Sequence, residues 1–169
     1  LHIFIDLLDL YDVKCTFFIV AELAKKYKKI VLKLLENGHE IGCHSLNHKL
    51  PLNQPILNFR SDLKLAKEII ENEYGISVNG YRAPCFNLND EYLKVVQELN
   101  FKFDSSFILS KLNNKYGNLS LSTFEKIENL IYRNKNNFYE FEIPVIKKNF
   151  FKIPLSGTGY MRLLNNYLL

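Results

Sequence analysis

Apolar residues recur at helical spacing over the first dozen positions, and a strand-like run follows them. Residues 1–12 place aspartates at positions 6, 9 and 12 opposite the apolar side chains, which predicts an amphipathic helix with a solvated acidic face. Residues 14–20 are almost continuously apolar and are rich in β-branched and aromatic side chains. This composition is typical of a strand buried on both sides in a parallel sheet.

Strands and helices continue to alternate along the next part of the chain. Helical spacing returns over residues 21–37 with a break near Lys28, and Gly38 is placed to end this helix. A strand over residues 40–43 completes a β-α-β unit. Four further elements are predicted: a helix that Asn58 caps and Gly75 ends, a strand over 78–82, a helix from Asn89 or Asp90 to Leu99, and a strand over 101–104.

The regular pattern weakens after residue 110. Residues 110–137 are rich in asparagine and lysine without a clear period, so we expect an insertion or a long active-site loop there. Residues 138–145 return to strand-like alternation, in which Glu140 and Glu142 are predicted to share a solvated face. Residues 153–160 form a glycine-containing loop, after which a helix is expected.

This succession of elements predicts an α/β fold with a parallel sheet, either doubly wound or closed into a barrel. A chain of 169 residues with 47% hydrophobic content can bury a substantial core, and we expect one domain over residues 1–169. The net charge of +4 arises from scattered lysines and does not indicate nucleic-acid binding. No apolar run is long enough to span a bilayer, and the first residues lack the basic region of a signal peptide.

The three cysteines, Cys15, Cys43 and Cys85, are widely spaced and include no C-x-x-C pair. A disulfide framework is therefore not expected, and a reducing compartment is the simpler interpretation. Cys43 adjoins His44, but neighbouring strand residues point to opposite faces. We interpret Cys43 as a small buried hydrophobic residue.

Two histidines follow the predicted strand at 40–43. His44 and His48 are four residues apart, so a helical turn after Cys43 would direct both imidazoles to one point. Neutral imidazole is a common donor to zinc and related ions, but two histidines need at least one carboxylate and a water to complete a site. In isolation this spacing also fits two surface histidines that bind nothing. Its position at the carboxyl end of a strand, where α/β folds place their chemistry, favours a metal site.

Further polar residues follow the later strands. Arg82 and Pro84 come directly after one strand, and Asp104 ends the next. In a barrel these strand ends converge with the His44 and His48 loop on one rim. A metal held by imidazoles, an arginine and a carboxylate together indicate metal-assisted hydrolysis.

These motifs, in this order, resemble the polysaccharide deacetylase family, also called NodB-like or carbohydrate esterase family four. The resemblance rests on the segments at 15–18, 38–41, 44–48, 81–84 and 103–106. Within the family, the segments at 142–145 and 154–164 are most similar to deacetylases of bacterial exopolysaccharide loci. The resemblance covers nearly the whole chain.

The resemblance implies a distorted (β/α) barrel that removes N- or O-acetyl groups from an amino-sugar polymer or its lipid-linked precursor. It implies that His44 and His48 bind a divalent metal ion, usually zinc. Arg82 and Asp104 would then be catalytic residues, Arg82 holding a carboxylate and Asp104 supporting the arrangement. The expected partner is an acetylated polysaccharide or oligosaccharide, and the exopolysaccharide subgroup implies a cytoplasmic location.

The substrate and oxyanion residues follow from the same resemblance. The Cys85 N–H, next to Pro84, would help to stabilise the tetrahedral oxyanion, although the family often has tyrosine or serine at position 85. Tyr160 either contacts the substrate or is a core aromatic residue.

The sequence departs from the family at both ends. The family has an aspartate pair before the first helix, one a general base and the other a metal ligand, and a late histidine that acts as general acid. Asp6, Asp9 and Asp12 lie in the first predicted helix and do not match that pair, and no histidine follows His48. We therefore expect a fragment of the barrel, incomplete at both ends.

Three functions remain open from the sequence. The first is a metal-dependent polysaccharide deacetylase. The second is a catalytically silent carbohydrate-binding or scaffolding module that keeps the barrel without the aspartate pair. The third is a metallohydrolase with another substrate, because a metal and its water do not by themselves select acetamides.

Overall fold

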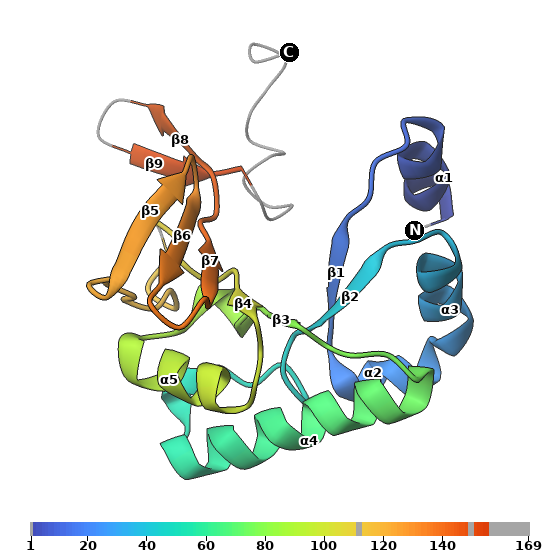
Figure 1. The fold of residues 1–169 in the computed structure, drawn as a ribbon, viewed down its shortest axis with the longest axis horizontal. Helices are drawn as coiled ribbons and strands as arrows, with labels where there is room; N and C mark the ends of the chain where they lie inside the picture. Colours follow the sequence, from blue (N-terminus) through green and yellow to red (C-terminus); the bar gives the residue numbers. More distant parts are fainter. Residues whose placement is uncertain (1, 111–112, 149–150, 156–169) are drawn as a thin grey trace.

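The computed structural model describes residues 2–110, 113–148 and 151–155 (Figure 1). Its helices are α1 (His2–Leu10), α2 (Ala21–Lys26), α3 (Lys28–Glu36), α4 (Ile56–Tyr74) and α5 (Asp90–Glu98), with short 3₁₀ turns η1 (Pro51–Asn53) and η2 (Pro84–Phe86). Its strands are β1 (Thr16–Ile19), β2 (Glu40–Cys43), β3 (Gly80–Tyr81), β4 (Phe103–Asp104), β5 (Phe124–Glu128), β6 (Ile131–Asn134), β7 (Tyr139–Phe141), β8 (Val145–Lys148) and β9 (Phe151–Pro154).

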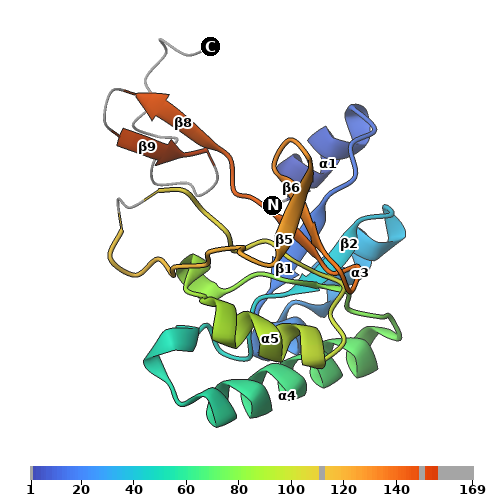
Figure 2. The ribbon, with the colours of Figure 1, turned by 60° about the vertical axis from the view of Figure 1, so that its left-hand side comes forward.

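The main sheet has seven strands in the order β1-β2-β3-β4-β7-β6-β5, and β8 pairs with β9 separately. Strands β1 to β4 and β7 run parallel, whereas β6 and β5 are antiparallel to their neighbours. The sheet curves, with α2, α4 and α5 along its outer side (Figures 1 and 2). The predicted α/β class with a parallel sheet is confirmed. Among the described residues the curved sheet is open, because β1 and β5 pair with only one strand each.

The helix boundaries follow the sequence closely, with one error. The predicted break near Lys28 occurs at Tyr27, between α2 and α3. Gly75 ends α4 in the left-handed conformation, with φ of 64°, as a glycine C-cap does. The assignment of Asn58 as the cap of α4 is wrong, because the helix begins at Ile56 and the Phe59 N–H already bonds the Pro55 carbonyl.

Two strand predictions also need correction. All four residues of β1 are half-buried rather than buried on both sides, because β1 is an edge strand of the described sheet. The segment 110–137 is not irregular throughout, since it contains β5 and β6. Four of the five residues of β5 are exposed. A strand without a buried face has no alternation of apolar and polar residues by which the sequence could predict it. Its pairing with β6 defines it instead.

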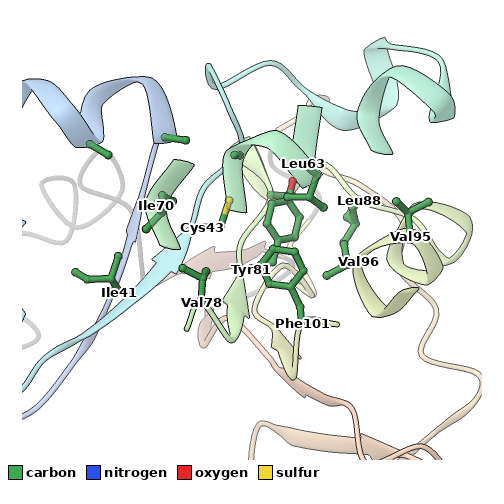
Figure 3. Close-up of a cluster of buried hydrophobic side chains, with 14 of the residues drawn as sticks. Ile41, Cys43, Leu63, Ile70, Val78, Tyr81, Leu88, Val95, Val96 and Phe101 are labelled. Carbon is green, nitrogen blue, oxygen red and sulfur yellow. The ribbon is translucent and has the colours of Figure 1, made fainter. Parts of the chain in front are cut away.

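The core lies between the outer face of the sheet and the helices (Figure 3). Ile41, Cys43 and Tyr81 project from β2 and β3 toward Leu63 and Ile70 of α4, and each of these five residues is at most 1% exposed. Burial raises the pKa of the Cys43 thiol to about 12, so it stays protonated. The interpretation of Cys43 as a buried hydrophobic residue is confirmed. No helix in the described ranges has both the length and the apolar character that a membrane span requires.

The inner face of the sheet carries aromatic rings that lie over two glycines. Phe18 and Phe103 meet edge to face, with 6.3 Å between ring centroids. A Cβ on Gly42 would lie 2.6 Å from the Phe18 ring, and a Cβ on Gly80 would overlap the Phe103 ring. The missing side chains at Gly42 and Gly80 therefore let the two rings lie flat against neighbouring strands.

We predict that Gly80→Ala destabilises the fold by about 1–3 kcal/mol, the usual cost of overpacking. Phe103→Leu removes the ring atoms that the new methyl group would meet, so Gly80→Ala should cost less in a Phe103→Leu background. Urea unfolding of the two single variants and the double variant measures this coupling. Strictly additive losses would contradict the prediction.

Candidate functional site

His44 and His48 lie in the loop that follows β2, and their rings meet edge to face with centroids 5.0 Å apart. The helical turn predicted for them does not form. Ser45 and His48 instead adopt left-handed backbone conformations, with φ of 69° and 64°. The two rings thus lie together in a loop with two left-handed residues, so the predicted proximity holds although the helical turn predicted as its cause is absent.

A main-chain hydrogen bond fixes the tautomer of His44. Its Nδ1 lies 2.7 Å from the Arg82 carbonyl oxygen, and because that oxygen only accepts, Nδ1 carries the proton. The pKa of His44 is lowered to about 4, chiefly by burial and in part by the charge of the neighbouring His48, while the bond to the Arg82 carbonyl opposes this lowering. His44 therefore presents a neutral imidazole whose Nε2 lone pair is available. This is the form in which histidine binds a metal.

Arg82 connects the histidine loop with β4. Its Nε donates to the Ser105 carbonyl at 2.9 Å, and its Nη2 donates to Ser105 Oγ at 2.6 Å. The guanidinium carbon lies 4.4 Å from the centre of the Phe18 ring, a cation–π contact. Three contacts with β1 and the segment after β4 hold the half-buried side chain in one orientation.

The turn after Arg82 is also strained. Cys85 and Phe86 have φ of 52° and 53°, so two successive non-glycine residues are left-handed. Such conformations persist where the surrounding structure imposes them, and they are common at functional sites. Within the described part of the chain, the Cys85 N–H donates no hydrogen bond. Pro84 is buried and anchors the start of this turn.

Segment 113–118 lies against this turn. The Gly117 N–H bonds the Phe86 carbonyl at 3.0 Å, and the Asn118 N–H bonds the Leu88 carbonyl at 2.9 Å. A Cβ on Gly117 would overlap the Leu88 backbone, so only glycine permits this approach. Part of the predicted long loop therefore lies beside the candidate oxyanion turn.

Asp104 is fully buried at the end of β4 and is not grouped with the histidines. Its carboxylate accepts hydrogen bonds from the Ser106 N–H and hydroxyl, at 2.8 and 2.9 Å. In the parallel register of β4 and β7 it lies beside Glu140, which is also 0% exposed. Burial raises the pKa of both carboxyl groups, and the pKa of Glu140 is raised further by the Asp104 charge.

The predicted solvated face of Glu140 and Glu142 is wrong. Glu142 is 7% exposed and accepts a hydrogen bond from the Tyr132 hydroxyl at 2.7 Å. Glu140 lies on β7 and Glu142 just after it, and β7 stands between β4 and β6 inside the sheet rather than at a solvated edge. Glu140, Ser105 and Ser106 were missed as contributors to the site. Recognising them requires knowledge that β4 pairs with β7, and the spacing of neighbouring residues does not reveal this long-range pairing.

The two histidines fit part of a metal site. Neutral imidazole nitrogens suit zinc and related divalent ions, and a catalytic zinc site commonly has three protein ligands and one open position. Among the described residues, no group of three or more histidine, cysteine, aspartate or glutamate side chains is placed to bind one ion. His44 and His48 thus supply two ligands. Tyr160, the other predicted substrate residue, lies outside the described residues.

We predict that Arg82→Lys destabilises the protein by about 1–2 kcal/mol, because a single ammonium cannot reproduce both bonds to Ser105 and the stacking on Phe18. Arg60→Lys is the matched control, since the Arg60 side chain forms an exposed ion pair with Glu98 and no other polar contact with a residue that the structure describes. It should change stability by less than about 0.5 kcal/mol. Chemical unfolding compares the two, and equal losses would contradict the role given to Arg82.

The comparisons with known proteins agree with this architecture. Residues 2–103 match the family model described as polysaccharide deacetylase. The peptidoglycan-N-acetylglucosamine deacetylase of Bacillus cereus is 33% identical over 69 residues, which are 41% of this chain and 30% of that protein.

Solved structures share the fold at lower identity. A candidate polysaccharide deacetylase from Mycobacterium smegmatis has a TM-score of 0.62 and 21% identity, over 92% of this chain and 50% of that one. A Bacillus anthracis pseudoenzyme of carbohydrate esterase family four has a TM-score of 0.55 and 20% identity, over 69% of this chain and 36% of that one. The chain thus spans at most half the length of these proteins. With its family model matched over more than half of its residues, the chain belongs to the polysaccharide deacetylase family.

Proposed function

We propose that this chain is part of a metal-dependent hydrolase that removes acetyl groups from an amino-sugar-containing polysaccharide or its precursor. The observation that carries the proposal is the ring pair of His44 and His48. The Arg82 carbonyl fixes the His44 tautomer, which leaves Nε2 free as a donor beside the second imidazole. Membership of the deacetylase family supports acetyl transfer to water as the reaction.

His44 and His48 would hold the divalent ion, for which we propose zinc. When bound, such an ion supplies a Lewis acid for the acetyl carbonyl and lowers the pKa of water. The Cys85 N–H, which donates no hydrogen bond among the described residues, would donate to the oxygen that becomes negative in the transition state. Arg82 would orient a catalytic carboxylate, while Ser105 holds its guanidinium.

The substrate proposal is an acetylated polysaccharide or oligosaccharide. The Bacillus cereus relative is named for peptidoglycan N-acetylglucosamine, which supports an amino-sugar polymer as the substrate class. The motifs at 142–145 and 154–164 support the narrower proposal of an exopolysaccharide-locus deacetylase, acting in the cytoplasm. Residues 156–164 of that motif lie outside the described residues.

A second candidate is a catalytically silent module that binds carbohydrate. One observation favours it: among the described residues, no carboxylate is placed to complete a metal site with the two imidazoles. The Bacillus anthracis protein of similar fold is itself a pseudoenzyme. The two candidates differ in whether a bound metal leads to acetate release.

We predict that the wild-type chain binds one zinc ion and that His44→Ala and His48→Ala each weaken binding by at least about tenfold, because each removes one of the two imidazole donors. His39→Gln is the matched control. His39 is buried at the opposite end of β2, where its Nδ1 accepts a bond from the Cys15 N–H, and its substitution should leave zinc affinity unchanged. Competition with a chromophoric chelator measures the affinities.

Acetate release from acetylated chitooligosaccharides and from peptidoglycan fragments then separates the candidates. Release that is lost in both histidine variants supports the hydrolase. Zinc binding without release supports the silent module. Absence of zinc binding by the wild-type chain would contradict the metal assignment itself.

A further inference from the structure

Glu140 forms a link between two parallel strands without reaching solvent. It stands beside Asp104 in the register of β7 and β4, which are adjacent in Figure 1. Its Oε1 accepts hydrogen bonds from the Ser106 N–H at 3.0 Å and from the Phe107 N–H at 2.8 Å. A side chain of β7 therefore fixes the main chain that leaves β4.

Ser106 connects this fixed main chain to the candidate oxyanion turn by hydrogen bonds. Its hydroxyl donates to Asp104 Oδ1 at 2.9 Å and accepts from the Ala83 N–H at 2.8 Å. Ala83 stands between Arg82 and Pro84, at the start of the turn that contains Cys85. The neighbouring Ser105 holds the Arg82 guanidinium and donates to the Phe141 carbonyl of β7 at 2.9 Å. Both serines thus connect the site to β7.

The two carboxyl groups need one proton between them. Glu140 Oε2 is buried and accepts no hydrogen bond from a described group, whereas Asp104 accepts two from Ser106. A proton on Glu140 that is directed at Asp104 would satisfy Glu140 Oε2 and leave one negative charge in the pair. The influence of each group on the other agrees with this, because Glu140 lowers the pKa of Asp104 whereas Asp104 raises the pKa of Glu140.

The charged and titratable groups around the pair agree with this arrangement. Arg82, directly after β3, interacts electrostatically with both carboxyl groups and favours one negative charge there. Tyr81, which lies beside Asp104 in the strand register, has a pKa well above 10 and stays neutral. Tyr132 of β6 lies opposite Glu140, and its pKa is raised to about 12.

We propose that Glu140 is a positioning residue of this site: through Ser106, Ser105 and Asp104, its carboxyl group sets the placement of the Arg82 side chain and of turn 83–86. The catalytic part of this proposal rests on the proposed hydrolase function, and the structural part does not. Glu140 acts in its neutral form, as an acceptor for two N–H groups and a donor to Asp104.

Three variants test the proposal. Glu140→Ala removes every bond of the carboxyl group. Glu140→Gln retains an acceptor for the two N–H groups and a donor toward Asp104. Glu142→Ala is the matched control, because it removes another buried carboxyl group of the same segment, whose side-chain partner is Tyr132. The readouts are amide hydrogen exchange of Ala83, Ser106 and Phe107, and kcat and KM for acetate release from an acetylated chitooligosaccharide with zinc present.

We expect Glu140→Ala to speed exchange at these three amides at least about tenfold and to lower kcat at least about tenfold, with KM changed less than about twofold. Glu140→Gln should restore most of the slow amide exchange and most of kcat. Glu142→Ala should lower the melting temperature without changing either readout. If Glu140→Ala and Glu142→Ala lower the melting temperature alike and neither changes exchange at Ala83, the positioning role is overturned.

The pH dependence of stability tests the neutral form. Because the pKa of Glu140 is raised on folding from its ordinary 4.5, the unfolded chain ionises first as pH rises, and the wild type loses stability above that pH. Glu140→Gln lacks this loss, so its melting temperature relative to wild type should rise between about pH 5 and pH 8. A constant difference would overturn the assignment of the proton to Glu140. A wild-type chain that releases no acetate defeats the proposed function, while exchange and pH data still decide the positioning role.

Discussion

The register of the parallel strands is the constraint on which the site depends. Cys43, Tyr81, Asp104 and Glu140 occupy one row across β2, β3, β4 and β7. Because the strands run in one direction and share this register, the loops that follow them leave the sheet at one edge. A slip of one residue in any strand would turn its row to the other face and would separate these loops. The sheet therefore brings the candidate site residues to one edge, and the loop conformations set their final positions.

The loop conformations at the candidate site cost conformational free energy. Ser45, His48, Cys85 and Phe86 all occupy the left-handed region, although none is glycine. Each such residue costs on the order of 1–3 kcal/mol. These four are among nine described non-glycine residues with positive φ, and they lie in the two loops at the candidate metal and oxyanion positions. A core that is almost fully buried around Tyr81 and α4 offsets this cost. The stable part of the molecule thus holds the functional part in conformations that the loops would not adopt alone.

Local sequence predicted the order of elements well because each helix has its own apolar face and its own end signal. Gly75 and Asn89 illustrate this, since one ends α4 by a left-handed conformation and the other caps α5 with its side chain. The histidines, Arg82 and the turn after it were recognised because they follow strands directly. Glu140 was misread for the opposite reason. Its environment is decided by which strands flank β7, and a long-range pairing leaves no trace in the spacing of neighbouring residues.

The acceptor for His44 Nδ1 is the carbonyl oxygen of residue 82, an atom that every amino acid carries. The protonation geometry of this imidazole is therefore independent of which side chain stands at the partner position. In many metal-binding histidines a carboxylate side chain fixes the tautomer, and a single mutation can remove that carboxylate. Here the tautomer changes only if the main chain directly after β3 moves. A substitution of the arginine side chain would therefore leave the carbonyl that orients this imidazole in place.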